Sequence, residues 1–281
     1  MIHNKIIDGN LQSQVIRDKI QYEITKLNIK PKLAIVLIGN NPASEIYVKI
    51  KIKRADEVGI EVVLYTFNES VTNLKLLECI ASLNNNKTIH GILLQMPLPP
   101  HIDKNSLLTI ISPDKDVDGF SPINVGRLYS QTNGFIPCTP LGIMHLIKSV
   151  REDITGLKAT IIGRSTIVGR PVAELLLQQD CTVTIIHSKS QNIDEDTKKS
   201  DIIVAAVGVP KLIKREFINP GAIVIDVGIN KIQSQIVGDV DFENVIDLVS
   251  YITPVPGGVG PMTVAYLLHN TLKAAQLSLL R

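Results

Sequence analysis

The hydrophobic and polar positions of this chain alternate between short apolar runs and longer segments with helical spacing. Apolar runs of this kind are typical of parallel strands that are covered on both faces. In the first part of the chain the pattern predicts strands at 33–39, 60–66 and 91–95 and helices at 43–58, 72–84 and 103–111. The stretch from Ser112 to Pro122 is rich in Pro, Asp and Gly and breaks the pattern, so we place a domain junction there.

A second alternating series follows a helix predicted over 139–150. Its strands are KATIIG at 158–163, TVTIIH at 182–187, DIIVAAVG at 201–208 and AIVIDVG at 222–228. Strands and helices at these intervals, the clearest helix being 169–180, form the doubly wound α/β pattern. A last helix runs from Met262 to about Leu280, and the pattern alone does not decide which domain it packs on. The sequence therefore predicts an α/β protein of two domains, the second a Rossmann-type doubly wound parallel sheet.

Composition narrows the class of protein. The 281 residues carry a formal net charge of +2, with 44% hydrophobic and 20% charged residues, which is typical of a globular protein. Because Lys and Arg are dispersed and no apolar run reaches about 18 residues, we expect neither a nucleic-acid nor a membrane partner. The first residues lack the apolar core of a secretory signal. Three widely spaced cysteines fit neither a disulfide framework nor a zinc site, so we expect a soluble cytoplasmic protein without a metal, and Cys138 is interpreted as a small core residue.

The segment KATIIGRSTIVGRPVA at 158–173 predicts a dinucleotide site. A buried strand ends at Gly163, and a helix opens near Gly169 with Pro171 in its first turn. A Rossmann domain holds pyrophosphate on backbone N–H groups at such a helix N-terminus. The spacing is G-x-S-x-x-x-G, with Ser165 where the usual fingerprint has glycine, so a purely structural turn is the alternative.

The next strand indicates which dinucleotide binds. NAD enzymes usually carry Asp or Glu at its end, about 20 residues after the glycines, to bind the ribose hydroxyls. Here the strand is followed by His187-Ser188-Lys189, and Arg164 lies in the glycine turn itself. Basic and hydroxyl groups accept a 2′-phosphate, which favours NADP. The alternative is a solvated strand end without a role in binding.

A candidate reaction centre lies in the first domain. Ser44, Tyr47 and Lys51 follow one another at helical spacing and share one face of the predicted helix. An ordinary exposed face would look the same, but burial could lower the pKa of the lysine and make it a proton-transfer group. Gln95 ends a buried strand at the edge where α/β sheets bind ligands. Asp116 and Asp118 follow in DKDVDGF, and either could be a turn former or an acceptor for a heterocycle.

Several separated motifs occur in an ordered set: NPASEIYVKIKIK, LLQMPLP, DKDVDGF, PCTP, GRSTIVGRP, HSKS, AIVIDVGIN and TPVPGGVGPMT. In this order they resemble the bifunctional methylenetetrahydrofolate dehydrogenase/methenyltetrahydrofolate cyclohydrolase family along nearly the whole chain. The glycine turn, atypical against the general fingerprint, is similar to that family's own version.

The resemblance implies roles for individual residues. Tyr47 matches a tyrosine that stacks on the folate ring, Lys51 the lysine central to hydrolysis, and Gln95 the glutamine that bonds this lysine. Asp118 matches the aspartate that anchors the pterin, and these four form the expected catalytic set. Arg164 and Ser188 are expected towards the 2′-phosphate. The expected cofactor residues are Gly163, Arg164, Ser165, Gly169, Ser188, Thr139 and Ile229, and the expected substrate residues are Tyr47, Gln95, Asp118, Gly257, Gly258 and Thr263.

The resemblance also implies an architecture and an activity. Two α/β domains flank a cleft: residues 1–118 with 264–281 bind folate, and residues 119–263 bind NADP. The expected enzyme is a homodimer that oxidises 5,10-methylenetetrahydrofolate with NADP and then hydrolyses the methenyl product to 10-formyltetrahydrofolate. Two alternatives stay open on the residues themselves. One is another two-domain NADP oxidoreductase acting on a small hydroxy or amino acid, and the other is a catalytically silent dinucleotide-binding protein.

Overall fold

The computed structural model describes residues 2–233 and 235–280, which divide into two compact units. Unit 1 comprises Met1–Ser13 and Thr139–Thr263, and unit 2 comprises Gln14–Cys138 and Val264–Arg281. Both are α/β units whose main sheets are parallel, so the predicted fold class is confirmed. Helices α1 (Gly9–Ile24) and α10 (Val259–Ser278) each begin in unit 1 and end in unit 2. Within the described residues no helix is both long and apolar enough to cross a membrane.

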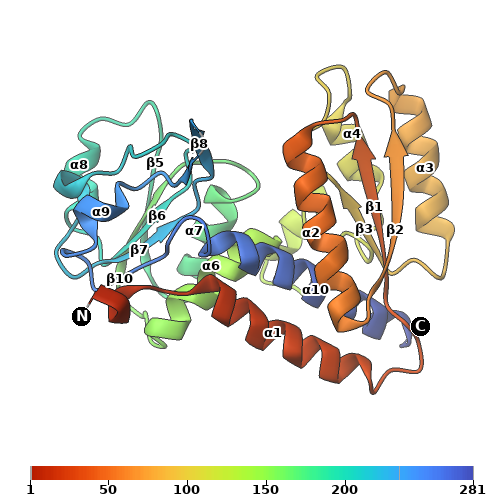
Figure 1. Ribbon diagram of the computed structural model, residues 1–281, viewed down its shortest axis with the longest axis horizontal. Coiled ribbons are helices and arrows are strands. Elements are labelled where there is room, and N and C mark those ends of the chain that lie inside the picture. Colours follow the sequence, from red (N-terminus) through yellow and green to blue (C-terminus); the bar gives the residue numbers. More distant parts are fainter. Residues whose placement is uncertain (1, 234, 281) are drawn as a thin grey trace. The chain divides into compact units, whose positions relative to one another are not determined.

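Unit 2 is built on a three-stranded parallel sheet of order β2-β1-β3. The strands are β1 (Lys32–Ile38), β2 (Glu61–Phe67) and β3 (Gly91–Leu94). Helices α3 (Asn73–Asn85) and α4 (Lys104–Ile110) cover one face, where they bury a core with Val36 and Leu94. Helix α2 (Pro42–Val58) lies on the opposite face (Figure 1). The alternate residues of β1 thus serve two cores, which explains why the strand is apolar throughout.

Unit 1 contains a five-stranded parallel sheet of order β10-β7-β6-β4-β5. Its strands are β4 (Lys158–Ile162), β5 (Thr182–Ile186), β6 (Ile202–Ala205), β7 (Ile223–Asp226) and β10 (Tyr251–Ile252). The other elements are η1 (Ile2–Lys5), α6 (Cys138–Val150), α7 (Gly169–Leu177), α8 (Ile193–Thr197), η2 (Arg215–Phe217) and α9 (Phe242–Val245). All four strands predicted for this half are confirmed, and β10 is an addition too short to show a pattern.

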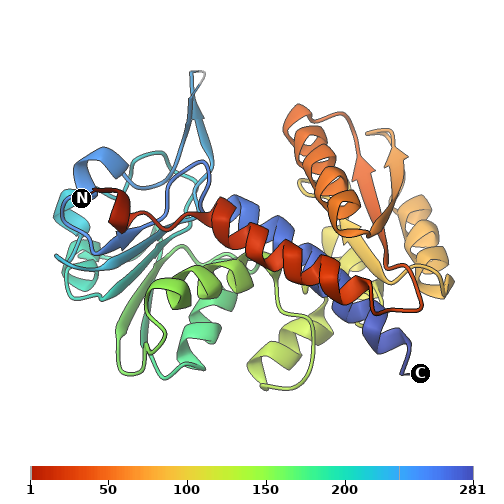
Figure 2. The ribbon, with the colours of Figure 1, turned by 60° about the horizontal axis from the view of Figure 1, so that its bottom comes forward.

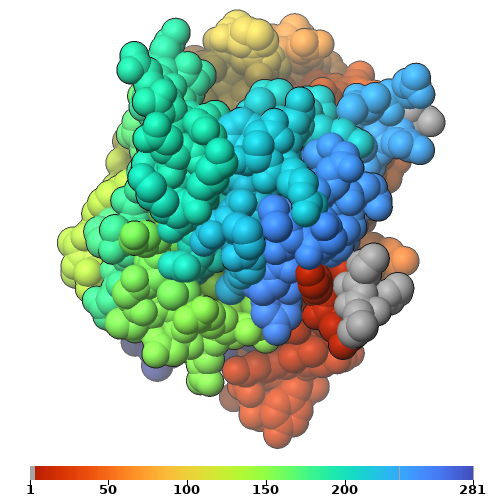
Figure 3. Space-filling model, turned by 90° about the vertical axis from the view of Figure 1, so that its left-hand side faces the viewer, coloured from red at the N-terminus to blue at the C-terminus, as the bar shows by residue number. Residues whose placement is uncertain are grey.

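A two-stranded antiparallel hairpin leaves this sheet. It consists of β8 (Asn230–Ile232) and β9 (Gln235–Val237), paired so that Asn230 lies opposite Val237. The hairpin projects from the body of unit 1 in the ribbon of Figure 2 and stands out from the surrounding surface in the space-filling view of Figure 3. Sequence patterning did not predict it, because three-residue strands are too short for an alternation to be recognised.

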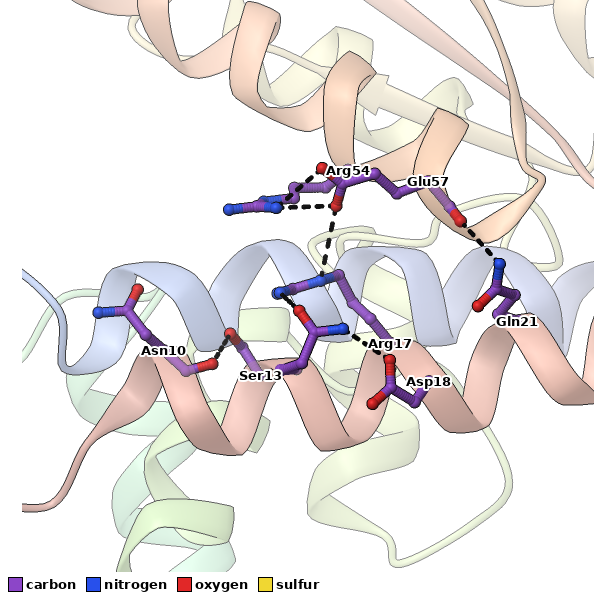
Figure 4. Close-up of polar contacts among 8 residues, drawn as sticks. Asn10, Ser13, Arg17, Asp18, Gln21, Arg54 and Glu57 are labelled. Carbon is purple, nitrogen blue, oxygen red and sulfur yellow. Dashed lines mark hydrogen bonds and ion pairs between the residues drawn. The ribbon is translucent and has the colours of Figure 1, made fainter.

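Helix α1 was also missing from the predicted elements, and polar contacts attach it to α2 in unit 2 (Figure 4). Gln21 Nε2 donates to the Glu57 carbonyl at 3.2 Å, and Arg17 Nε lies 3.9 Å from Glu57 Oε2. Arg54 donates to both carboxylate oxygens of Glu57, at 2.9 and 2.8 Å. Glu57 therefore connects the two helices through both its carboxylate and its carbonyl group.

The predicted junction segment belongs to unit 2 and is held by buried polar side chains. Asp116, 1% exposed, accepts hydrogen bonds from Ser121 N at 2.8 Å and from Asn124 Nδ2 at 2.9 Å. Asn270 on α10 donates to the carbonyls of Val117 and Ile136, at 2.8 and 3.1 Å. These bonds explain why residues 119–138, including α5 (Pro122–Tyr129), belong to unit 2. The sequence-based division instead began the second domain at residue 119.

Substitution of Asn270 tests whether its hydrogen bonds hold residues 117–136 in unit 2. Asn270→Ala would remove the Nδ2 donor from the Ile136 carbonyl and leave the Val117 carbonyl with only the weak thiol donor of Cys138. We therefore expect the free energy of unfolding to fall by about 1–3 kcal/mol. Urea denaturation followed by circular dichroism measures it. Asn133→Ala, at an exposed position of the same unit, is the control and should change stability by less than about 0.5 kcal/mol. Equal effects of the two substitutions would contradict this account.

Candidate active site

A lysine and a glutamine from different elements meet in unit 2. Lys51 comes from α2, whose start is fixed by Asn41: its side chain accepts from the N–H groups of Ala43 and Ser44, with Pro42 in the first turn. Gln95 follows the carboxyl end of β3. Lys51 Nζ donates to Gln95 Oε1 at 2.8 Å. The helix face and the strand end that the sequence singled out separately thus converge in space.

The orientation of the Gln95 amide is set by its neighbours. Its Nε2 donates to the Met96 carbonyl at 2.6 Å, so its oxygen is the atom that faces Lys51. The same carbonyl accepts from Ser44 Oγ at 3.4 Å. The backbone of Gln95 is held in the sheet by a bond from its N–H to the Val36 carbonyl at 2.9 Å. Lys51 therefore meets a neutral acceptor whose position is fixed by the sheet.

Burial controls the charges around Lys51. It lowers the pKa of the Lys51 ammonium, and the nearby Asp118 carboxylate opposes this effect only in part. Burial likewise raises the pKa of Asp118 to about 6, against the attraction of Lys51. An amine with a lowered pKa beside a carboxyl with a raised one is a pair suited to proton transfer.

The two aspartates of DKDVDGF have different surroundings. The Asp116 carboxylate accepts hydrogen bonds from N–H groups of the following turn. The Asp118 carboxylate instead lies close to Lys51 and Cys138. The Cys138 thiol donates to the Val117 carbonyl at 3.3 Å, and burial raises the pKa of the thiol well above its ordinary range. Cys138 is thus buried as predicted, but its contact with Asp118 was not foreseen.

Tyr47 lies one helical turn before Lys51 and keeps 37% of its surface exposed. Partial burial raises the pKa of its hydroxyl. An exposed aromatic face beside a buried amine offers a flat heterocycle a stacking surface next to a proton-transfer group. Unit 2 therefore contains all four residues of the expected catalytic set. Lys51, Gln95 and Asp118 lie close together, and Tyr47 is one helical turn from Lys51.

In unit 1 the chain makes a compact turn between β4 and α7. Gly163 has φ +123°, and a Cβ there would lie 2.2 Å from the Ala206 carbonyl oxygen; a Cβ on Gly169 would lie 2.1 Å from the Gly163 oxygen. Only glycine fits at either position. Ser165 Oγ accepts from the N–H groups of Val168 and Gly169 at 3.1 and 3.3 Å. The serine of the atypical fingerprint therefore holds the turn that leads into α7, whose N-cap residue is Val168.

The side chains around this turn fit a phosphorylated dinucleotide. Arg164 and Ser188 are exposed after the carboxyl ends of the paired strands β4 and β5. The residues directly after β5 are His187, Ser188 and Lys189, so no carboxylate stands where one would repel a 2′-phosphate. The N-terminus of α7 adds the positive end of a helix dipole.

The remaining predicted positions also lie in unit 1. Thr139 and Thr263 are joined by a hydrogen bond of 2.8 Å between their hydroxyls. Gly257 has φ +104°, and a Cβ on Gly258 would lie 2.6 Å from the Pro254 carbonyl oxygen. Ile229 is 52% exposed and follows β7. Among the described residues no group of three or more His, Cys, Asp or Glu side chains could hold a metal ion.

Comparisons with known proteins cover almost the whole chain. A family model described as the catalytic domain of tetrahydrofolate dehydrogenase/cyclohydrolase matches residues 7–118, and the model of its NAD(P)-binding domain matches residues 137–279. The bifunctional protein FolD of Rickettsia bellii is 52% identical over 96% of this chain and 98% of its own.

Two solved structures are similar as well. The bifunctional FolD enzyme of Campylobacter jejuni superposes with a TM-score of 0.95 at 47% identity, covering 97% of this chain and 98% of its own. A methylenetetrahydrofolate dehydrogenase-cyclohydrolase of Trypanosoma brucei, solved with NADP and an inhibitor, has a TM-score of 0.93 at 38% identity, covering 98% of each chain.

The raised pKa of Asp118 predicts a pH-dependent stability difference. Its folded pKa of about 6 exceeds the ordinary 3.8, so the folded protein holds the proton more tightly and this contribution to stability is lost as the pH rises from about 4 to about 6. Asp118→Asn mimics the protonated form. We expect it to exceed wild type in unfolding free energy by roughly 1–3 kcal/mol at pH 7.5 and to match it near pH 4.

Urea unfolding at both pH values measures this difference. Asp56→Asn removes an exposed carboxylate from the same unit and controls for the change in net charge. A variant less stable than wild type at pH 7.5, or a gap that does not close at pH 4, would contradict the raised pKa.

Proposed function

Because this chain belongs to the tetrahydrofolate dehydrogenase/cyclohydrolase family, we infer that the Lys51–Gln95–Asp118 cluster is its folate site and that the Gly163 turn is its NADP site. The protein is a bifunctional enzyme of one-carbon metabolism. It oxidises 5,10-methylenetetrahydrofolate with NADP and hydrolyses the 5,10-methenyl product to 10-formyltetrahydrofolate. The observation that carries the site assignment is the 2.8 Å bond between Lys51 and Gln95 beside the half-buried Asp118.

We propose that folate binding involves residues 1–118 and 264–281 and that NADP binding involves residues 119–263. The compact units differ from this division, because residues 1–13 group with unit 1 and residues 119–138 with unit 2. Three of the four folate-site residues, Tyr47, Lys51 and Gln95, fall inside the match to the family's catalytic domain, and Asp118 is its last residue. The glycine turn falls inside the match to the NAD(P)-binding domain. Thr139 and Ile229 contribute to the cofactor site, and Gly257, Gly258 and Thr263 contact the substrate.

Oxidation depends chiefly on positioning. Bound NADP supplies the hydride acceptor. The ring of Tyr47 stacks on the folate, and Asp118 accepts hydrogen bonds from the pterin, so that the reacting carbon is held in place. Arg164 and Ser188 bind the 2′-phosphate, while the positive end of the α7 helix dipole attracts the pyrophosphate. The nitrogens of the substrate stabilise the methenyl cation, so little acid–base help is needed from the protein.

Hydrolysis depends on proton transfer. Water adds to the methenyl carbon and loses a proton, which gives a neutral hydroxyl adduct. The hydroxyl group then loses its proton as the formyl C=O forms, the ring C–N bond breaks and the departing nitrogen gains a proton. Lys51 accepts and donates these protons, because burial lowers the pKa of its amine and Gln95 fixes the position of this amine. Gln95 cannot exchange protons itself, so it holds the lysine without competing for its proton.

The enzyme is a cytoplasmic homodimer. Cys79, Cys138 and Cys181 are free thiols, as suits a reducing compartment, and dimers are the usual assembly of the family that the motifs resemble. Light scattering of the purified protein during size-exclusion chromatography tests the assembly, and a mass near 31 kDa would exclude the dimer.

Lys51→Met should separate the two activities. We expect methenyl hydrolysis to fall by about 10²-fold or more, because a general acid–base group contributes roughly that amount, while the Kd for NADP⁺ stays within about twofold. Decay of methenyl absorbance measures hydrolysis, and titration calorimetry measures binding. Lys49→Met, two residues away on the exposed side of α2, is the matched control. Wild-type hydrolysis by Lys51→Met would refute the assignment.

Arg164→Ala tests the cofactor site. Losing a charge-assisted contact to the 2′-phosphate should raise the KM for NADP⁺ by about tenfold while leaving the KM for NAD⁺ within about twofold. Initial rates of methylenetetrahydrofolate oxidation with each cofactor supply both values. Arg151→Ala removes an exposed arginine from the same unit and serves as control. If the KM values for NADP⁺ and NAD⁺ rose by the same factor, Arg164 would not bind the 2′-phosphate.

A further inference from the structure

Two buried carboxylates lie behind the carboxyl edge of the sheet in unit 1. Asp226 ends β7 and is 3% exposed, and Asp239 follows the β8–β9 hairpin and is 0% exposed. Burying an ionised carboxylate is costly unless hydrogen bonds replace its hydration. Neither residue takes part in the chemistry proposed above. The hydrogen bonds that their carboxylates accept indicate what each of them does in the fold.

Asp239 holds two loops at once. Its Oδ2 accepts from the backbone N–H groups of Val207 and Gly208, at 2.7 and 3.0 Å, in the loop that leaves β6. Its Oδ1 accepts from Asn230 Nδ2 at 2.9 Å, at the base of the hairpin that follows β7. A Cβ on Gly228 would lie 2.2 Å from the same Oδ1, so the second loop also packs directly against this carboxylate.

Asp226 holds Asp239 in turn. Its Oδ1 accepts from Asp239 N at 2.9 Å and from Gly228 N at 3.0 Å, and its Oδ2 accepts from Val240 N at 2.9 Å. The N–H of Asp226 itself donates to Thr253 Oγ1 at 2.8 Å. Hydrogen bonds of Asp226 and Asp239 thus connect Thr253, directly after β10, with the loop after β6.

Both loops held by Asp239 border the cofactor site. Ala206, directly before Val207, is the residue whose carbonyl oxygen leaves no room for a side chain on Gly163. Ile229 lies between Gly228 and Asn230, the two residues that contact Asp239 in the second loop. The carboxyl edge of an open parallel sheet is where such folds bind dinucleotides.

We propose that Asp239 is a positioning residue for the dinucleotide: its carboxylate holds the loops after β6 and β7 in the shape that receives NADP. The inference rests on the proposed cofactor site at the Gly163 turn. Asp239 has no contact with the cofactor itself and acts through Val207, Gly208 and Asn230. Preorganising the two loops lowers the ordering cost that binding would otherwise incur.

The Asn230–Asp239 contact permits an exchange experiment. Asn230→Asp alone places two carboxylates at hydrogen-bonding distance, and their repulsion should displace both loops. Exchanging the residues, Asn230→Asp with Asp239→Asn, restores one carboxylate facing one amide. In the exchanged protein the amide oxygen at position 239 still accepts from Val207 and Gly208, while its NH₂ group donates to the carboxylate introduced at position 230.

The readouts are the Kd for NADP⁺ by titration calorimetry and the rate of methenyl hydrolysis without cofactor. We expect Asn230→Asp to raise the Kd about tenfold or more, with hydrolysis within about twofold of wild type, and the exchange to return the Kd to within about threefold. Gln235→Glu adds the same negative charge at an exposed position of the same unit and controls for charge. A purely structural role would change hydrolysis and thermal stability together with the Kd.

Two outcomes would overturn the proposal: a folded Asn230→Asp protein with a wild-type Kd, or a folded exchange protein that binds NADP⁺ ten times more weakly than wild type. If Asn230→Asp does not fold, the exchange protein decides alone. Failure of the proposed cofactor site is distinguishable, because the KM of Arg164→Ala for NADP⁺ would then be unchanged whatever the exchange showed.

Discussion

The partial dehydration of the Lys51 amino group is the condition on which the chemistry of unit 2 depends. A fully hydrated ammonium would keep its proton at neutral pH, and one paired closely with a carboxylate would keep it more firmly still. Here burial lowers the pKa against the attraction of Asp118. Gln95 supplies an acceptor without a charge, so it holds the amine in place and leaves its proton transferable.

Unit 1 meets a different demand, and its solution lies largely in the backbone. A dinucleotide carries its charge along its length and reacts at a remote ring, so its binding site must supply spaced donors and a fixed shape. The turn at Gly163 brings two strand ends close together, and Ser165 holds the turn that leads into α7. Buried carboxylates hold the adjacent loops from behind. The candidate site of unit 2 is thus built mainly from side chains, whereas that of unit 1 depends more on the geometry of the main chain.

Most strands and long helices could be predicted because the spacing of their apolar residues fits only one type of secondary structure. Helix α1 escaped prediction because its apolar residues are sparse: Ile16 and Ile20 are buried while Leu11, Val15 and Tyr22 are exposed. The hairpin escaped because its strands have three residues each. The pattern did reveal where the sheet edges lie, and these edges carry the candidate sites.

Within the site, residue type could be predicted but environment could not. Asp116 and Asp118 are two positions apart and look alike in sequence, yet one is committed to a turn and the other faces Lys51. Asn270 contributes from a helix about 150 residues further along, and no local signal announces it. Asp239 shares this property, since its partners at Val207 and Gly208 are backbone groups without a sequence signature.

Ser165 has a consequence for selectivity among anions. Because its hydroxyl already satisfies the donors at Val168 and Gly169, the helix N-terminus does not need an ion from solution to complete its hydrogen bonds. Inorganic phosphate, abundant in cells, gains little by displacing a bonded hydroxyl, whereas a dinucleotide adds contacts along its whole length. A phosphate group at this helix start would therefore be attracted by the helix dipole and by charged side chains such as Arg164, and not by unsatisfied N–H groups of Val168 and Gly169.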